Sequence, residues 1–369
     1  MSRVQVVILN WNGEQFLRRF LPRVVSTCEP SGAEVVVADN GSTDGSEGVV
    51  KGDFPSVRWL PLGENYGFAE GYNRALAKCD GELFVLLNSD VEPAEGWLEP
   101  LVERMDKKQR LTAIQPKILS YNNPQMFEYA GASGGFLDLY GYPFCRGRIM
   151  STTEQDCGQW NDVRKVFWAS GAAMMVRAEV WRKAGGLDGD FFAHMEEIDL
   201  CWRMQLEGYK VTVVPESVVY HVGGGTLPAT SPFKLFLNYR NNLLMLENNL
   251  AKTFALKNLK SGKPADKAAA RGLAQARRRI FQRKCLDWLS AGVYLATLKI
   301  GCFKAVWKAY KEYGKLRQAP YINDVRAYLS LHGQDAAVSG IYGKWIILTS
   351  MLKGKDVFRS IKEKDFYNI

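Results

Sequence analysis

Leu83-Phe-Val-Leu-Leu87, followed by Asn88-Ser-Asp90, sets the pattern that the first part of the sequence repeats. An unbroken apolar run of this length is typical of a strand buried on both faces of a sheet, and the polar tripeptide ends it. Strands of the same kind are predicted at two earlier places, Arg3 to Leu9, which ends at Asn10, and Ala33 to Ala38, which ends at Asp39. Each of these strands therefore finishes on a polar side chain.

Segments with helical spacing separate the strands. Apolar residues recur on one side of Glu14 to Val25, and a second helix is predicted from Ala69 to Lys78, after a short strand from Val57 to Leu60. Strands that alternate with helices favour an α/β fold with a doubly wound sheet covered by helices on both faces. In such sheets ligands bind beyond the carboxyl ends of the strands, which is where the polar side chains are expected.

Asp90 and Asp39 each allow two interpretations. Asp90 can hold a divalent cation against a diphosphate, because such cations prefer oxygen ligands, or it can belong to an ordinary turn. Asp39 can accept hydrogen bonds from the base or ribose of a nucleotide, or it can begin an Asx turn in the loop that ends at Gly45. The residue types alone leave both alternatives open.

The acidic segment Glu196-Glu-Ile-Asp199 opens a helix that is predicted to continue through Glu207. Carboxylates in a first turn are favoured by the helix dipole, which is the simplest explanation of the segment. Helical spacing also brings Asp199 and Arg203 within reach of each other as an ion pair. Glu197 lies about a quarter-turn away, so it can face a cleft and act as a general base.

Histidine is scarce, and the chain has His194, His221 and His332 alone. His221 ends a predicted strand and precedes Gly223-Gly-Gly225, where backbone or a ligand can approach closely. A neutral imidazole is a common metal ligand, and a histidine satisfied within the core is the alternative.

The character of the chain changes between residues 121 and 148, where aromatic residues are mixed with glycines. This aromatic excursion suits a sugar acceptor or its lipid carrier, and it suits equally a satellite hydrophobic cluster beneath a loop. Further elements are predicted as follows: a strand from Val163 to Val176, a helix from Ala178 to Ala184, strands from Lys210 to Pro215 and Val218 to His221, and helices from Phe233 onward with a polar break from Lys260 to Gly272.

Composition excludes several classes of protein. Hydrophobic residues make up 47% of the chain and charged residues 24%, which rules out collagen-like and disordered chains. The seven cysteines include no Cys-x-x-Cys pair, which favours a reducing compartment and argues against a structural zinc site. No apolar run reaches the length of a membrane span or a signal-peptide core, so a cytoplasmic location is expected. The glycine motifs of dinucleotide-binding and P-loop proteins are missing, as is a nucleophile elbow.

Charge is divided unevenly along the chain. Residues 1–250 carry a net charge of −7 and residues 251–369 a net charge of +16, against an overall charge of +9. The basic part contains a stripe of lysines at helical spacing and an arginine-rich segment before it: Lys304, Lys308, Lys311, Lys315, Arg277 to Arg279, Arg283 and Lys284. Such a region favours the anionic surface of a membrane, with a helix packed on the protein body as the alternative. No nucleic-acid-binding motif accompanies the charge, so nucleic acid is not expected as a partner.

Five segments, in their order along the chain, resemble the motifs of the inverting family 2 glycosyltransferases, especially their rhamnosyltransferase-like branch. They are Val6 to Gly13, Val37 to Ser46, Asn65 to Asn73, Leu86 to Val91 and Met195 to Arg203. The fourth segment, Leu86-Leu-Asn-Ser-Asp-Val91, resembles an Asp-x-Asp metal motif, and the fifth resembles a Glu-Asp-x-Asp-Leu-x-x-Arg motif. The similarity extends over residues 4–250.

The resemblance implies a GT-A fold, that of the nucleotide-diphospho-sugar transferases, with a doubly wound mixed sheet. It implies a GT-A domain over residues 1–250, with a nucleotide-binding half (1–115) and an acceptor and catalytic half (116–250), followed by a basic helical region (251–369). It assigns the site residues as follows: Asn10, Asp39, Asn65, Asn73 and Asn88 around the nucleotide sugar, Asp90 and His221 as ligands of Mg²⁺ or Mn²⁺, and Glu197 as the catalytic base.

Two positions depart from the family pattern. Asn88 stands where the first Asp of Asp-x-Asp is expected, which removes one charge from the metal site. Glu197 stands where Asp is more usual, which leaves Glu196 and Asp199 as rivals for the role of base.

The sequence therefore predicts a metal-dependent inverting glycosyltransferase of polysaccharide or cell-wall biosynthesis. We expect it to move a hexose or rhamnose from a UDP- or dTDP-sugar to a hydroxyl of a lipid-linked surface glycan, as a peripheral protein at the cytoplasmic face of the membrane. One alternative is a catalytically silent protein of the same fold that binds a glycan or a membrane surface. A sugar-nucleotide pyrophosphorylase is disfavoured, because Gly13 is the one glycine in the loop after the first strand.

Overall fold

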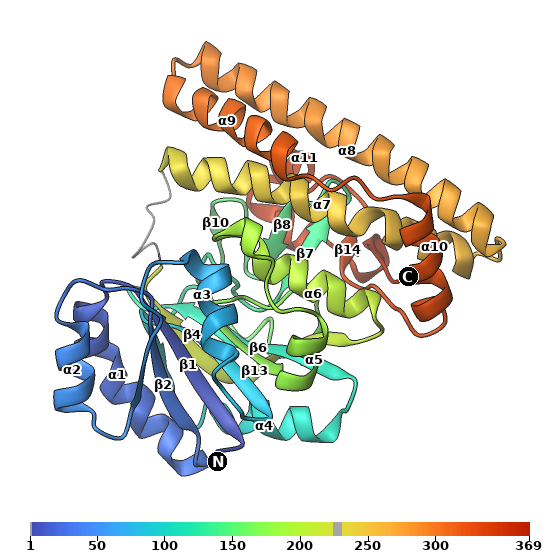
Figure 1. The fold of residues 1–369 in the computed structure, drawn as a ribbon. Coiled ribbons are helices and arrows are strands. Elements are labelled where there is room, and N and C mark those ends of the chain that lie inside the picture. The colour runs from blue at the N-terminus through green and yellow to red at the C-terminus, as the bar shows by residue number, and fades with distance from the viewer. Residues whose placement is uncertain (1, 224–230) are drawn as a thin grey trace.

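The computed structural model describes residues 2–223 and 231–369 (Figure 1). Its main sheet is nine-stranded and mixed, with the order β11-β13-β6-β12-β4-β1-β2-β3 and with β5 paired to β13. Its strands are β1 (Val4–Asn10), β2 (Glu34–Asp39), β3 (Arg58–Pro61), β4 (Leu83–Asn88), β5 (Val91–Pro93), β6 (Leu111–Ser120), β11 (Arg164–Lys165), β12 (Ala173–Arg177) and β13 (Lys210–His221).

The parallel part of the sheet confirms the predicted strands and their polar ends. Strand β1 lies between β2 and β4, and all three run parallel. Their register pairs Asn10 with Asp39 and Leu9 with Asn88, so the polar ends meet at one edge of the sheet. The antiparallel strand β12 then joins β4 to β6, which makes the sheet mixed.

Helices cover both faces of the main sheet, as predicted. They are α1 (Glu14–Cys28), α2 (Ser46–Asp53), α3 (Gly67–Leu76), α4 (Leu98–Lys107), α5 (Ala178–Lys183) and α6 (Glu196–Leu206). Val6 and Ile8 of β1 pack with residues of α1, α2 and α4 on one face, while Val7 packs with residues of α3, α5 and α6 on the other. The alternation of side chains along a strand thus supplies two hydrophobic cores.

Three predicted strands have different bounds in the structure. The segment from Val163 to Val176 is not one strand, because Phe167 and Trp168 donate their backbone N–H groups to the carbonyl of Gly135 instead of to a sheet neighbour. Conversely, the two strands predicted between Lys210 and His221 form the single strand β13, in which a bulge between Val214 and Val218 absorbs the extra residues.

The long helices also correct the sequence analysis. Helix α7 (Pro232–Lys260) is separated from α8 (Ala265–Ala296) by a short turn, so the break predicted from Lys260 to Gly272 is wrong over most of its length. Gly272 lies inside α8, where a Cβ would come 2.5 Å from the backbone nitrogen of Ala255. It therefore permits close packing of α8 on α7 instead of ending a helix. Gly224 and Gly225, which belong to the glycine run predicted after His221, lie outside the described residues.

The aromatic excursion forms a second, six-stranded sheet together with the end of the chain. Its strands are β7 (Gly135–Asp138), β8 (Pro143–Cys145), β9 (Arg148–Ile149), β10 (Thr152–Thr153), β14 (Ile341–Tyr342) and β15 (Phe366–Tyr367). The rings of Phe136, Phe144, Tyr342 and Phe366 pack together with centroids 4.8–6.4 Å apart. For these residues the structure favours a hydrophobic cluster, the second of the two interpretations.

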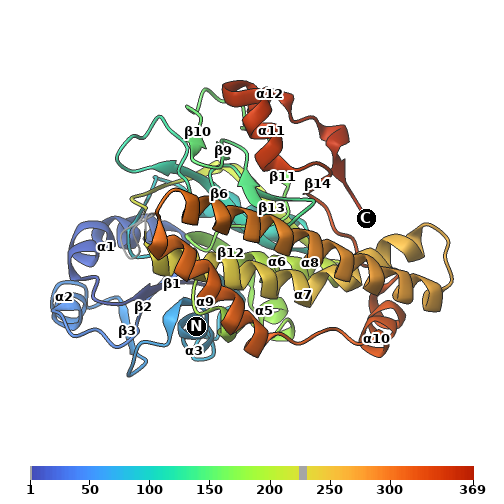
Figure 2. The same ribbon diagram turned by 90° about the horizontal axis from the view of Figure 1, so that it is seen from above.

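Three long helices, α7, α8 and α9, lie together along one side of the molecule (Figures 1 and 2). The remaining elements are α9 (Ile300–Leu316), α10 (Ile322–His332), α11 (Ile346–Lys353), α12 (Val357–Ser360) and the short helices η1 (Glu29–Ser31), η2 (Gly189–Phe191), η3 (Gly354–Asp356) and η4 (Glu363–Asp365). The predicted boundary at residue 250 falls inside α7, and one hydrophobic core contains residues from both sides of it. Over residues 2–223 and 231–369, no helix has the length and apolar character to cross a membrane.

The basic part of the chain is used in two ways. Lys304, Lys308, Lys311 and Lys315 are exposed on α9, as the predicted stripe requires. Arg283, in contrast, is buried, and it pairs with Asp287 at 2.8 Å and lies 3.8 Å over the ring of Tyr142. Arg279 donates to the carbonyl of Leu139. These two arginines were predicted to face a membrane, but they bind the aromatic excursion instead.

Gly67→Ala should destabilise the protein. Gly67 has a φ of +75°, and a Cβ would come 2.4 Å from the ring of Phe192, so alanine is strained in both backbone and packing. We expect a loss of about 1–3 kcal/mol in the free energy of unfolding, measured by urea denaturation. Gly48→Ala is the matched control, because a Cβ there meets nothing within 4 Å in helix α2, and it should stabilise by about 0.5–1 kcal/mol. Equal effects of the two substitutions would contradict this account of residue 67.

Candidate active site

Asn10 and Asp39 join at the ends of β1 and β2. The Asn10 amide nitrogen donates to Asp39 Oδ1 at 3.2 Å and to Ser42 Oγ at 3.1 Å, and the backbone N–H of Ser42 donates to Asp39 Oδ2 at 3.1 Å. Asp39 therefore accepts from the backbone of the following loop, three residues on and not two as in an Asx turn, and each carboxylate oxygen keeps further acceptor capacity. Asn10 Oδ1 is buried and has no partner among the described residues, which leaves an acceptor for a ligand.

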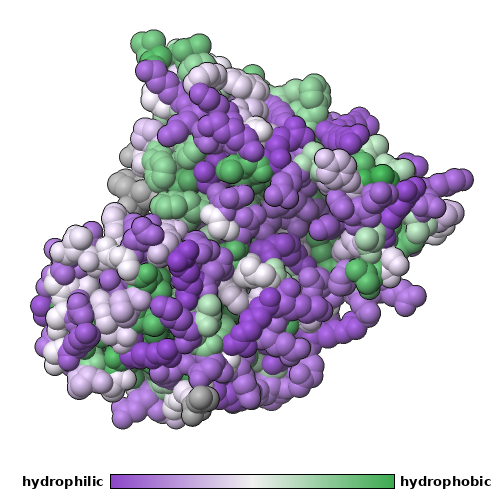
Figure 3. All heavy atoms as spheres, viewed as in Figure 1, coloured by the Kyte–Doolittle hydropathy of each residue, from purple (hydrophilic) through white to green (hydrophobic). Residues whose placement is uncertain are grey.

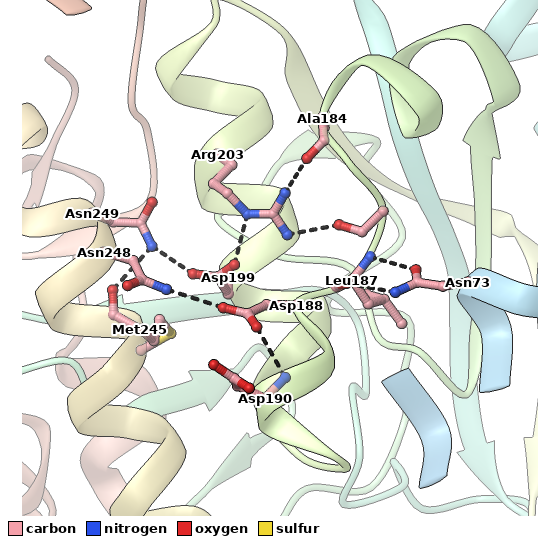
Figure 4. Close-up of polar contacts among 11 residues, drawn as sticks. Asn73, Ala184, Leu187, Asp188, Asp190, Asp199, Arg203, Met245, Asn248 and Asn249 are labelled. Atoms are coloured by element: carbon pink, nitrogen blue, oxygen red, sulfur yellow. Dashed lines mark hydrogen bonds and ion pairs between the residues drawn. The ribbon is translucent and has the colours of Figure 1, made fainter. Parts of the chain in front are cut away.

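Asn65 and Asn73 use their side chains within the protein. Asn65 Oδ1 accepts from Asn40, the residue after Asp39, at 3.1 Å and from the N–H of Gly67 at 2.9 Å, so it links the end of β2 to the start of α3. Asn73 forms two hydrogen bonds with the backbone of Leu187, at 2.7 and 2.9 Å (Figure 4). The structure thus brings Asn65 to the polar strand ends, whereas it directs the amide of Asn73 to a brace between α3 and the chain before α6.

Asp90, His221 and Glu128 form a buried chain of charged groups. His221, at the end of β13, pairs with Val91 of β5 and so lies beside Asp90, with its Nε2 3.1 Å from Asp90 Oδ1. The other ring nitrogen, Nδ1, lies 3.2 Å from Glu128 Oε2. Burial lowers the pKa of His221, but the hydrogen bonds and charges of the two carboxylates outweigh it and raise that pKa to about 10. Asn88 joins the group, its amide nitrogen 3.4 Å from His221 Nε2.

The donor atoms of Asp90 and His221 fit a divalent cation, provided that the cation displaces the proton that the raised pKa of His221 keeps on the imidazole near neutral pH. Adjacent ligands of an octahedral Mg²⁺ are about 3 Å apart, which matches the spacing of Asp90 Oδ1 and His221 Nε2. A histidine that binds a metal through one ring nitrogen commonly has a carboxylate beside the other. In His221 the carboxylate of Glu128 lies beside Nδ1. Among the residues that the structure describes, no three His, Cys, Asp or Glu side chains form a complete metal site. The pair therefore suits a cation that takes its other ligands from diphosphate and water.

The acidic start of α6 separates the three candidate bases. Asp199 is fully buried, pairs with Arg203 at 2.7 Å as predicted, and accepts from Asn249 at 2.7 Å (Figure 4). Glu196 is buried as well, at 4% exposure, while Glu197 is partly exposed. Each glutamate has a buried Oε2 without a partner in the described part of the chain. Burial raises the pKa of Glu197 to about 7, and burial together with the charge of Glu197 raises the pKa of Glu196 well above its usual value. Of the three acids, Glu197 is the one whose residue keeps some exposure.

Glu197 lies close to the residues that pair with the polar end of β4. A Cβ on Gly171 would lie 3.8 Å from the Cβ of Glu197, and it would also contact the ring of Phe68. The next residue, Ala172, accepts the backbone N–H of Asn88 at 3.0 Å. The start of α6 and the polar end of β4 therefore contact consecutive residues, Gly171 and Ala172.

Helix α7 holds the bend that precedes α6. Asn241, which is fully buried, donates from its amide to the carbonyls of Phe191, Ala193 and His194 at 2.7–2.8 Å. Arg240 donates to the carbonyl of Phe191 at 2.9 Å and to that of Asp190. In this bend Phe192, His194 and Met195 have positive φ values, which non-glycine residues rarely adopt.

Two family models match consecutive parts of the chain. The model "Glycosyl transferase family 2" matches residues 5–144, and the model "Glycosyl transferase family group 2" matches residues 83–231. Together they extend from β1 through β13 and include the polar strand ends and the start of α6.

This chain is a family 2 glycosyltransferase.

Individual relatives agree with this assignment. The N-acetylglucosaminyl-diphospho-decaprenol L-rhamnosyltransferase of Mycobacterium tuberculosis is 29% identical over 235 residues, which are 58% of this chain and 75% of that protein. The low-salt glycan biosynthesis hexosyltransferase Agl10 of Haloferax volcanii is 22% identical over 260 residues, 69% of this chain and 78% of that protein. A crystal structure of GalNAc-T7 with UDP, GalNAc and Mn²⁺ superposes with a TM-score of 0.52 and 17% identity, over 79% of this chain and 58% of the other. The GT-A fold predicted from the sequence is thus confirmed.

Three residues of the glycosyltransferase site escaped the sequence analysis: Glu128, Lys234 and Asn241. Glu128 lies in the aromatic excursion, where no pattern marks it. Lys234, in the first turn of α7, is half-buried, and its charge helps burial to lower the pKa of His194 to about 4. Each acts through contacts with segments distant in the chain, so no local spacing reveals it.

Two cavities in the described part of the glycosyltransferase lie away from this site. They have volumes of about 60 and 140 Å³ and lie between the second sheet and the C-terminal segment. Ligand pockets of drug size typically occupy about 300–1,000 Å³, so neither cavity accommodates a nucleotide sugar.

Glu197→Gln should stabilise the glycosyltransferase at alkaline pH. A carboxyl whose pKa rises from 4.5 to about 7 on folding costs nothing while it is neutral in both states, and the cost grows as the pH rises between these values. The neutral amide removes this cost, so the gain in unfolding free energy should be about 1–3 kcal/mol larger at pH 8 than at pH 5. Urea denaturation at both pH values measures it. Glu216→Gln, on the exposed bulge of β13, is the control and should give no such difference.

Asn241→Ala should act on turnover more than on donor affinity. Three carbonyls lose their shared donor, so the bend before α6 relaxes and Glu197 loses its position. We expect kcat to fall about tenfold or more while the donor KM changes less than about threefold. Asn242→Ala is matched, since Asn242 is equally buried on the same helix but donates to Gly141. If both variants lose kcat alike, Asn241 is a structural residue and not a positioning residue.

Proposed function

We propose that this enzyme moves a hexose or rhamnose from a nucleoside-diphosphate donor to a hydroxyl of a lipid-linked glycan, with inversion at the anomeric carbon and with a divalent cation. The observation that carries the proposal is the Asp90–His221 pair at 3.1 Å. Asp90 lies two residues after Asn88, whose backbone N–H binds Ala172, and the neighbouring Gly171 faces the Cβ of Glu197. A site for a diphosphate and a separate carboxylate for the acceptor are the two parts that such a transfer needs.

The donor is proposed to bind across the ends of β1, β2 and β4. The unpartnered Asn10 Oδ1 and the carboxylate of Asp39 are acceptors for the base or ribose of a UDP- or dTDP-sugar. Asn65 and Asn88 lie at either side of them, while Asn73 is proposed to act indirectly through its brace on Leu187. In the division proposed from the sequence, residues 1–115 carry this donor half, residues 116–250 the acceptor half and residues 251–369 the basic helices.

The cation is proposed to be Mg²⁺ or Mn²⁺, held by Asp90 and His221. When bound, it offsets the negative charge that develops on the leaving diphosphate. Glu128 would hold the imidazole in the orientation that presents Nε2. Asn88 contributes an amide where a carboxylate is usual, so the protein itself brings one charge less to the site. The GalNAc-T7 structure, which contains UDP and Mn²⁺, supports this part of the proposal.

Glu197 is proposed as the base. Its carboxylate takes the proton of the acceptor hydroxyl while the hydroxyl oxygen forms a bond to the anomeric carbon, and the bond from that carbon to the diphosphate oxygen breaks on the opposite face. The nucleoside diphosphate leaves with the bonding electrons. A pKa of about 7 suits this task, because the ionised form is populated near neutral pH and is still basic enough to accept the proton.

The acceptor is proposed to be a glycan on a lipid carrier, met at the cytoplasmic face of a membrane. The name of the Mycobacterium tuberculosis relative describes an acceptor with a diphospho-decaprenol carrier, and the exposed lysines of α9 suit an anionic surface. A catalytically silent protein with the same fold is the competing proposal, motivated by Asn88 and Glu197.

The test is release of nucleoside diphosphate from a panel of UDP-, dTDP- and GDP-sugars with an N-acetylglucosaminyl-diphospho-polyprenol acceptor. Asp90→Asn should reduce kcat by about a hundredfold or more and abolish its response to Mn²⁺, and Glu197→Gln should reduce it as strongly while keeping Mn²⁺-dependent donor binding. Glu216→Gln should retain wild-type turnover. Product formation that is unchanged in both site variants would overturn the residue assignments, and Mn²⁺-independent donor binding without product would support the silent alternative.

A further inference from the structure

Helix α8 exposes an apolar face along its second half. Residues Phe281, Cys285, Trp288, Leu289, Gly292, Val293 and Ala296 recur at the spacing of one helical face, and all are exposed. Phe281 is 67% exposed, Leu289 65% and Val293 55%, so no other part of the described chain covers this face. An apolar surface that is continuous over several turns of helix commonly marks a contact with a partner or a membrane.

The connection between α8 and α9 continues the same surface. Leu298, at the turn, is 82% exposed, and Leu295 and Ile300 on either side of it are 48% and 42% exposed. In Figure 1 this connection forms the outer end of the long helices, and Figure 3 shows hydrophobic residues at the same corner of the molecule. We refer to residues 281–300 as the hairpin end.

Cations surround the hairpin end, and exposed acids are missing from it. Residues 277–311 contain nine Lys and Arg and one acid, Asp287. Asp287 is buried and pairs with Arg283, so it does not contribute negative charge to the surface. Arg277, Arg278, Lys299, Lys304 and Lys308 are exposed at the borders of the apolar face. An apolar face bordered by cations alone complements an anionic lipid surface.

The dimensions of the hairpin end match shallow insertion. Residues 285–298 carry no exposed charge, and at 1.5 Å per residue the segment is about 20 Å long, well short of the hydrocarbon core of a bilayer. A helix of this kind lies in the interface with its apolar side among the acyl chains. A second copy of the chain is a poorer occupant, because two such faces would bring their cations together without acids to pair them.

The hairpin end is also next to the catalytic centre. A Cβ on Gly301, in the first turn of α9, would lie 3.7 Å from Pro232 at the start of α7. The exposed ring of Phe233 lies 6.2 Å from that of Phe192, in the bend that precedes Glu197, and 5.9 Å from that of Phe236, which packs with Ala305 and Ala309 of α9. Aromatic side chains therefore connect the hairpin end with the start of α6.

We propose that the hairpin end of α8 and α9 inserts into the surface of an anionic bilayer and presents the catalytic centre to it. The proposed contact with lipid is inferred from the hairpin end alone. That a lipid-linked acceptor then reaches the site along Phe233 and Phe192 rests on the proposed function. Exposed apolar side chains at the tip supply the insertion, and the bordering lysines and arginines supply the preference for anionic lipid.

Flotation with lipid vesicles tests the proposal. The full chain should float with vesicles of phosphatidylcholine containing 30% phosphatidylglycerol and much less with phosphatidylcholine alone, because the cations need an anionic partner. Leu289→Ser with Leu298→Ser should reduce the partition coefficient about tenfold or more. The matched control is Tyr321→Ser with Leu331→Ser, which removes side chains of 75% and 77% exposure near α10 and should leave partitioning unchanged. Lys299→Glu with Lys304→Glu should abolish the preference for anionic vesicles.

Three results would overturn the proposal: no flotation of the wild type, equal losses in the two serine variants, or an unaltered lipid preference in the glutamate variant. Light scattering identifies the competing occupant, since a wild-type dimer that becomes a monomer in Leu289→Ser with Leu298→Ser would assign this face to a second copy. Vesicle binding does not require turnover, so failure of the transferase assay leaves this test valid. Release of nucleoside diphosphate with a water-soluble acceptor should be the same in all of these variants.

Discussion

The bend from Phe192 to Met195 is the constraint on which the catalytic side of the molecule depends. Phe192, His194 and Met195 have φ values of +62°, +69° and +75°, a conformation that costs each non-glycine residue about 1–3 kcal/mol. Such a bend persists only when its surroundings hold it, and here they do so from both sides. Asn241 of α7 donates to two carbonyls of the bend, those of Ala193 and His194, and to that of Phe191 just before it. The first turn of α3 donates two N–H groups to the carbonyl of Phe192. Helix α6 therefore starts at a place that α3 and α7 determine together.

That placement gives the acids of one helix turn different properties. Asp199 is satisfied by Arg203 and Asn249, so its charge is part of the structure (Figure 4). Glu196 and Glu197 receive no such partner for Oε2, and burial raises the pKa of both. A buried acid without a partner is unfavourable for folding, and its presence beside strand ends that already gather polar groups is typical of a reactive site. The two glutamates differ in solvent exposure, because Glu197 is partly exposed and Glu196 is buried.

Local pattern was sufficient to predict the parallel strands β1, β2 and β4 and the polar residues at their ends. A strand such as Leu83 to Leu87 is recognisable from its own residues, and the polar residue after it must lie at the sheet edge. The failures involve contacts between distant segments. Glycine commonly ends a helix, yet Gly272 lies where α8 packs closely on α7. The residues around Glu128 in the sequence do not indicate that it is a partner of His221. Asn241 shows the same limit, because an asparagine inside a helix gains its role only from the bend that packs against it.

The basic region shows why net charge alone does not describe a surface. Its net charge of +16 includes arginines whose charge is paired within the protein. Arg283 pairs with Asp287 and lies over the ring of Tyr142. Arg317 pairs with the buried Glu247 at 2.7 Å. Guanidinium groups suit such positions because they bind carbonyls and aromatic faces in fixed geometry, whereas lysines remain hydrated at the surface. The inward arginines attach α8 to the aromatic excursion, and the outward lysines remain along α9. Because these contacts fix α8 relative to the main sheet, a surface that binds the end of α8 also sets the orientation of the sheet. The strand ends and Glu197 then face a fixed direction relative to that surface.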